Sequence, residues 1–227
     1  MNDDINLDRV WVGVAAEVRR RRPGPIERVA ARLLRSAGLA RALVTTPSLL
    51  LGWLVATVVV LGAGLAATLT TGTAYVPLLA PAVAGVGIAY AYGPGLDPAW
   101  ELAESMAVSD RMVLLVRALA VFGLNAVLGL AASVGSGTAA AVTFGWLVPM
   151  VAVCALALAA ATLSGSANVG VAAGLAGWII AVLGGRAATG SLVAAVTTSS
   201  LVVPYLLFAA GCAAVAWYAT RTPRRAL

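Results

Sequence analysis

The sequence predicts an all-α membrane protein: a polytopic helical bundle of six transmembrane helices, with an N-terminal amphipathic in-plane helix and both termini cytoplasmic. Hydrophobic residues make up 61% of the 227 residues and charged residues only 11%, whereas soluble domains carry about 25% charged residues. No charged residue occurs between Ala42 and Leu96, and Arg186 alone occurs between Ala118 and Thr220. These uncharged stretches far exceed the roughly 20 residues of one membrane crossing, so several crossings are expected.

The N-terminal region, residues 1–46, is expected to be cytoplasmic and amphipathic. Within it, Arg28, Arg32 and Arg35 recur at helical spacing and form a basic stripe opposite apolar residues. This segment has too many charges to cross a membrane and suits a connecting helix that lies in the membrane interface and contacts lipid. A helix that packs on a partner protein is the alternative.

Six spans are expected in residues 47–220, each an apolar run bounded by breaks rich in Gly, Ser, Thr or Pro. The last connection, residues 184–200, is too short for a further span and apolar enough to return into the membrane as a re-entrant hairpin. Prolines within the spans are expected to kink helices or to be tolerated there. The expected spans are 48–70, 75–92, 111–133, 139–162, 168–185 and 200–219, and the prolines are Pro77, Pro81, Pro149 and Pro204.

The arginines predict the orientation. With the N-terminus in the cytoplasm, six spans place every Arg except Arg186 on the cytoplasmic side, including the basic tail at 221–227. All 15 basic residues are Arg, a composition typical of a GC-rich genome. We therefore expect a multi-pass protein of the bacterial cytoplasmic (cell) membrane.

The composition also excludes several kinds of chemistry. The chain has neither Lys nor His, so it cannot form a Walker A loop, a Ser-His-Asp or Cys-His site, or a His-ligated metal site. Cys154 and Cys212 lie in apolar runs and are interpreted as packing residues, so no metal site is expected. The high pI is attributed to Arg at the membrane ends and not to nucleic-acid binding. We expect no enzymatic activity.

The connection between the second and third spans carries four of the nine acidic residues. Asp97 is a candidate N-cap, and a short helix that follows it carries Glu101 and Glu104 on adjacent turns. Ser109 can cap the third span. A solvated loop helix with ordinary caps is the alternative to a functional segment.

This connection resembles the first intracellular loop of the ABC-2 family of export permeases. In that family a Glu and Leu-rich residues precede Thr-Pro-x-Ser, with a basic residue some eight positions on. Here Glu101 or Glu104, Ala107, Ser109 and Arg117 stand in those places, and Ala107 or Val108 replaces the family's Pro. The basic in-plane helix, the six spans and the apolar dip are also similar, so the resemblance covers about residues 26–220.

The resemblance implies a coupling helix at 97–109 that docks on a separate ABC ATPase subunit, which binds the ATP and Mg. It implies that the chain is the permease subunit of an exporter, paired with a second permease subunit as a homodimer or heterodimer, and that it holds no cofactor itself. The residues that would contact the ATPase are Asp97, Trp100, Glu101, Glu104, Ser105 and Ser109.

Polar residues within the spans are candidates for the substrate pathway, because polar groups in a membrane are costly and often functional. We select Asn125, Thr143 and Tyr205; for Asn125 the alternative is an interhelical hydrogen bond. No span contains a carboxylate, which disfavours coupling to protons or sodium. The expected cargo is hydrophobic or amphipathic, such as an antibiotic, lipid, peptide or drug.

Two other functions stay open. In the first, the chain is a membrane-anchored regulatory or scaffold protein that holds a cytoplasmic partner through its N-terminal region and Trp11. Deleting residues 1–22 would abolish that role, whereas a permease would at most assemble poorly. In the second, the chain is an integral membrane enzyme acting on lipids, for which the sequence offers no catalytic constellation.

Overall fold

The computed structural model describes residues 11, 28–29, 31–32, 47–91, 110–137 and 140–220, and these residues form helices and short connections without any strand. The chain divides into two units, Met1–Val44 and Thr45–Leu227. In the first unit, the described residues are helical, and Trp11, Arg28 and Arg32 are exposed. Arg35 lies outside the described residues, so the basic in-plane helix stays a prediction.

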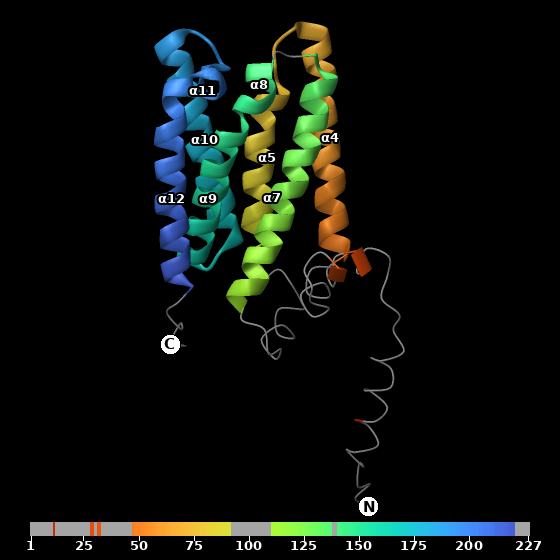
Figure 1. The fold of residues 1–227 in the computed structure, drawn as a ribbon, viewed down its shortest axis with the longest axis vertical. Helices are drawn as coiled ribbons and strands as arrows, with labels where there is room; N and C mark the ends of the chain where they lie inside the picture. Colours follow the sequence, from red (N-terminus) through yellow and green to blue (C-terminus); the bar gives the residue numbers. More distant parts are fainter. Residues whose placement is uncertain are drawn as a thin grey trace, which may run out of the picture. The chain divides into compact units, whose positions relative to one another are not determined.

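The second unit is a bundle of long helices joined by short connections (Figure 1). Five stretches in its described part are long and apolar enough to cross a membrane, and α5 is a shorter apolar helix of 16 residues. An all-helical architecture with several helices long and apolar enough to cross a membrane is therefore confirmed for the described residues, while the count of six crossings depends on α5 and stays a prediction. The elements are α4 Pro47–Thr71, α5 Val76–Ala91, α7 Asp110–Gly135, α8 Ala140–Gly145, α9 Leu147–Ser164, α10 Ala167–Thr189, α11 Ala194–Thr197, the 3-10 helix η1 Ser199–Leu201 and α12 Val202–Ala219.

The fourth expected span, residues 139–162, is two helices and not one. The α8 and α9 helices meet at Trp146. Pro149 explains the break, because it has no N–H to bond the carbonyl of Gly145 and its ring would clash with that carbonyl. Pro77 and Pro204 also fall in the first turns of their helices, where proline is tolerated; of the four span prolines, Pro81 lies inside a helix.

The α5 helix lies centrally in this unit and contacts α4, α7, α8, α9 and α10. Its buried residues include Val76, Ala80, Ala84 and Ile88, spaced four apart on one face. Small residues let its neighbours approach closely: a Cβ on Gly85 would lie 2.7 Å from Cγ1 of Val153 in α9. The core also contains Leu61, Val121, Trp146, Met150 and Trp178 from other parts of the unit.

The outer surface of the bundle is apolar. Large side chains such as Val59, Leu119, Ile180 and Leu207 are 63–71% exposed. In α12 the buried residues are Ala209 and Ala216 alone. A soluble protein rarely exposes so continuous an apolar surface, so this surface fits a lipid environment.

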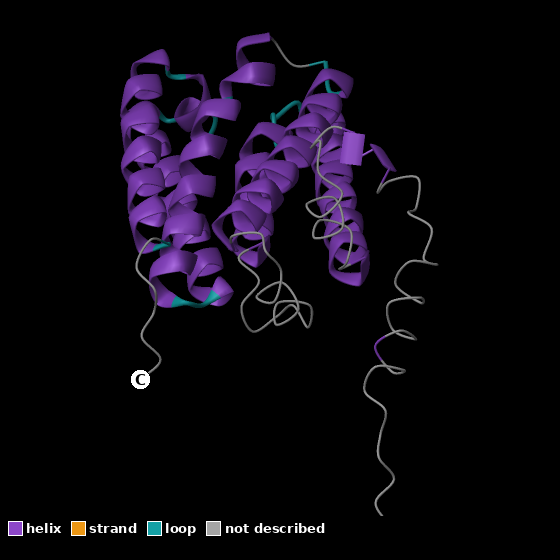
Figure 2. Cartoon of the chain, turned by 60° about the horizontal axis from the view of Figure 1, so that its bottom comes forward, coloured by secondary structure: helices purple, strands orange, loops and turns teal. Residues whose placement is uncertain are grey.

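The helix ends gather at two ends of the bundle. Pro47, Ala91, Asp110 and Ala219 lie at one end, together with the turn between α9 and α10 (Figures 1 and 2). We call this the terminal end. The connections between α4 and α5, α7 and α8, and α10 and α12 lie at the other, or distal, end.

Candidate functional site

The six residues expected to contact an ATPase all lie outside the described residues: Asp97, Trp100, Glu101, Glu104, Ser105 and Ser109. The structure describes the two helices that they connect. The α5 helix ends at Ala91 and α7 begins at Asp110, both at the terminal end (Figure 1). Residues 92–109 therefore join the central helix to the longest helix at that end.

Asn125 lies on the buried face of α7. That face repeats at helical spacing through Leu114, Ala118, Val121, Asn125 and Gly129, and the Asn125 side chain is 2% exposed. Its Nδ2 donates a hydrogen bond of 2.9 Å to the carbonyl oxygen of Val121 in the same helix. The sequence suggested an interhelical hydrogen bond for Asn125, whereas Nδ2 bonds within its own helix. The Oδ1 atom has no hydrogen-bond partner within the described part of the chain.

Three more buried polar atoms lack a partner among the described residues: Nε1 of Trp53, Oγ1 of Thr57 and Nε1 of Trp146. Thr57 and Trp146 are fully buried. We call Trp53, Thr57, Asn125 and Trp146 the polar seam. Each unsatisfied buried polar group costs about 1–3 kcal/mol, so four of them are an unusual feature of a packed interior.

The polar seam extends beyond the residues selected from the sequence, which include Asn125 but not Trp53, Thr57 or Trp146. A signal was present: Trp favours the membrane interface, and both residues fall inside apolar runs away from the charged flanks of those runs. Trp53 and Thr57 are also four residues apart, which places them on one face of α4.

Thr143 and Tyr205 lie elsewhere, at the distal end. Thr143 is buried in α8. The Tyr205 hydroxyl donates a hydrogen bond of 3.2 Å to the carbonyl oxygen of Ala195 in α11, and α11 contacts α8, α9 and α10. The three pathway residues expected from the sequence therefore occupy two places and do not form one site.

The α11 helix is the part of the last connection that returns into the bundle. Ala195 and Val196 are buried, and two glycines make room for them. A Cβ on Gly145 would lie 2.7 Å from the carbonyl oxygen of Val196, and one on Gly185 would lie 3.0 Å from the nitrogen of Ala195. Because α10 continues to Thr189, where Gly190 ends it with a left-handed backbone, the returning segment is shorter than the expected 184–200. Its place within a membrane stays a prediction.

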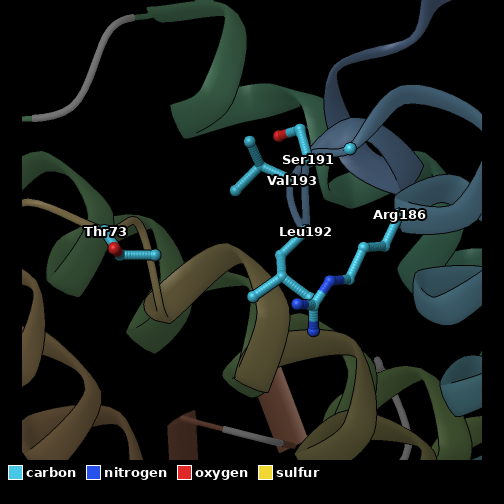
Figure 3. A pocket seen from close by; sticks show the side chains of 6 residues that line it. Thr73, Arg186, Ser191, Leu192 and Val193 are labelled. Carbon is cyan, nitrogen blue, oxygen red and sulfur yellow. The ribbon is translucent and has the colours of Figure 1, made fainter.

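A pocket of about 340 Å³ opens at the distal end, lined by Thr73, Arg186, Gly190, Ser191, Leu192 and Val193 (Figure 3). The Arg186 side chain is exposed and extends past Leu192. Arg186 lies in the last turn of α10, where the helix dipole favours a cation. The helix dipole therefore explains the presence of Arg186 at this position, and no bound ligand is needed to explain it.

No protein-family model, curated protein or solved structure matches the chain. In the part of the chain that the structure describes, no cluster of His, Cys, Asp or Glu is suited to a metal ion. The chemistry available in the polar seam is neutral hydrogen bonding, by two indole N–H donors, one hydroxyl and one amide oxygen.

Proposed function

We propose that the chain is the permease subunit of an ATP-binding cassette exporter in the bacterial cytoplasmic membrane. A separate ATPase subunit supplies the energy and docks on the coupling helix at 97–109. A second permease subunit completes the transporter. The terminal end faces the cytoplasm, which agrees with the Arg residues that precede α4, open α7 and follow α12.

The central position of α5 is the observation that carries this proposal. The segment 92–109 continues directly from α5, and α5 packs against five other helices. A movement of α5 would therefore be transmitted to α4, α7, α8, α9 and α10, against which it packs. Packed helices of this kind suit the transmission of domain movements.

The cargo that this bundle suits is hydrophobic or amphipathic. The outer surface is apolar, and the unpartnered polar atoms of the interior are neutral. An ion would need a charged or strongly polar partner within the membrane. An amphipathic molecule with a hydroxyl or amide group needs neutral donors and acceptors, which the seam offers.

A double charge reversal tests the proposal. Glu101→Arg with Glu104→Arg should stop export while the partner ATPase, supplied in excess, still hydrolyses ATP, because the coupling helix no longer matches its groove and the ATPase no longer docks. Cargo export and ATP hydrolysis are measured together in proteoliposomes. Asp3→Arg with Asp4→Arg is the matched control, since it makes the same change of charge in the N-terminal region and should leave export coupled. Full coupling in the Glu101/Glu104 variant would remove this segment from the mechanism.

A further inference from the structure

The polar seam occupies successive levels between the same helices. The lowest level, nearest the terminal end, is set by Gly87 of α5. A Cβ on Gly87 would collide with the indole Nε1 of Trp53 in α4 and would lie 3.0 Å from Cγ1 of Val121 in α7. Trp53 and Val121 therefore meet at Gly87, although they belong to different helices.

The level two turns higher is set by Gly129 of α7. A Cβ on Gly129 would lie 2.6 Å from Cη2 of Trp146 and 3.3 Å from Cβ of Ala80 in α5. The step from Val121 to Gly129 on α7 and the step from Gly87 to Ala80 on α5 each cover about two turns. The two helices therefore keep the same register across the seam.

Thr57 and Asn125 fall on the level between. Thr57 is one turn beyond Trp53 on α4, and Asn125 is one turn beyond Val121 on α7; both helices run from the terminal to the distal end (Figure 1). Ala84 is the α5 residue of this level, and all three residues are at most 2% exposed. The four residues of the polar seam therefore lie at successive levels that together cover about two helical turns.

We propose that the polar seam is a closed binding site for a neutral hydrogen-bonding group, which enters when α4 moves away from α5 and α7. A hydroxyl or an amide can accept from the indole of Trp53 or from that of Trp146, and can donate to Oδ1 of Asn125. Water has the same chemistry. An ion is a poor occupant, because none of the four side chains carries a charge.

The α4 helix is the wall suited to move. Between Gly52 and Thr71 its buried residues are confined to one narrow stripe, Thr57, Leu61, Gly64 and Thr68, and most of the other residues there are exposed. Its main contacts are with α5 and α7, whose residues Gly87 and Val121 meet Trp53. The α5 wall consists of Ala80, Ala84 and Gly87, which leave room for a bound group once α4 has withdrawn.

Cysteine labelling tests the opening. Thr57→Cys is made in a Cys212→Ala background that keeps Cys154, and the protein in native membranes is treated with a small water-soluble methanethiosulfonate. Since a thiol reacts as its thiolate and a buried cysteine is inert, we expect the cysteine at 57 to react about tenfold or more faster than Cys154. Cys154 is 4% exposed and lies outside the seam, which makes it an internal reference.

Two further variants complete the test. Val59→Cys lies on the exposed face of α4 and should stay as slow as Cys154, because lipid and not water covers it. Ala84→Cys, on the α5 wall at the same level, should react like the cysteine at 57. The proposal is overturned if the cysteines at 57 and 84 react no faster than Cys154.

Two amphiphiles distinguish the occupants. Monoolein, which has hydroxyl groups, slows labelling at position 57 if the seam takes an amphiphile, whereas methyl oleate, which has none, does not. Rapid labelling that neither amphiphile slows assigns the opened seam to water. The identification of the occupant as cargo rests on the proposed function. The labelling itself needs no ATPase. Slow labelling would therefore contradict the seam proposal, whereas failure to recover an ATPase would contradict the proposed function.

Discussion

The indole Nε1 of Trp178 donates a hydrogen bond of 2.7 Å to the backbone carbonyl oxygen of Leu78, which joins α10 to the central helix α5. The indole of Trp146 is also buried but has no such partner within the described residues. The two tryptophans therefore offer the same side chain with and without an interhelical hydrogen bond.

Replacing each of these tryptophans by Phe separates the hydrogen bond from the loss of volume. Both substitutions remove the same atoms from a buried site, but Trp178→Phe alone breaks a bond. We expect Trp178→Phe to destabilise the protein by about 1 kcal/mol more than Trp146→Phe does. Reversible unfolding in mixed micelles measures both. Equal losses would mean that the bond between α10 and α5 contributes nothing.

Gly170 tests the close approach of α10 to α9. A Cβ at this position would lie 2.7 Å from the carbonyl oxygen of Ala157 and 2.8 Å from Cβ of Ala161. Because the first of these atoms belongs to the backbone, Gly170→Ala must push two helices apart, and we expect a loss of about 1–3 kcal/mol.

Gly184→Ala is the matched control in the same helix. No atom lies within 4 Å of a Cβ at that position, so the substitution should be neutral or stabilise the helix by up to about 1 kcal/mol. Thermal denaturation of the purified protein compares the two variants. A loss at Gly184 as large as that at Gly170 would contradict the packing described for α10.

Tyr205 tests how α11 is held. Tyr205→Phe removes the hydrogen bond to Ala195 and leaves the ring in place. We expect faster hydrogen–deuterium exchange of the amides in residues 190–201, with little change in α9, because only the anchoring of α11 is weakened. Unchanged exchange in residues 190–201 would show that the glycine contacts alone hold α11.

The orientation of the bundle can be tested by labelling intact cells. In a background with Cys154→Ala and Cys212→Ala, an impermeant maleimide should label Ser191→Cys at the distal end and should spare Ala99→Cys until the cells are opened. The reason is that the Arg-rich terminal end stays in the cytoplasm. The reverse pattern would place the 92–109 segment outside and remove its proposed partner.

The long helices could be predicted closely from the sequence. Residues 48–70 and 111–133 were expected, and α4 and α7 extend one or two residues further at each end. Long apolar runs bounded by Thr-Gly or Asp leave little choice of boundary. The first turns of α5 and α12, each with a Pro, also lie close to the expected span starts.

The break at Trp146 and the polar seam could not be predicted in the same way. The apolar run through 139–162 has no charged or polar interruption at its centre, so its hydropathy hides the effect of Pro149 on the helix. The seam depends on neighbours from several helices, since Trp53 and Val121 meet only because Gly87 lets them. A single sequence gives the face on which Asn125 lies, but not which atoms of other helices share its level.

Recovery of a partner from native membranes tests the central claim most directly. The chain is purified from its own membranes, and co-purifying proteins are identified and quantified for the wild type and for the Glu101→Arg, Glu104→Arg variant. We predict a separate ATP-binding subunit in stoichiometric amount with the wild type and its loss from the variant. Purified chain that exports cargo without any ATP-binding subunit would contradict the account.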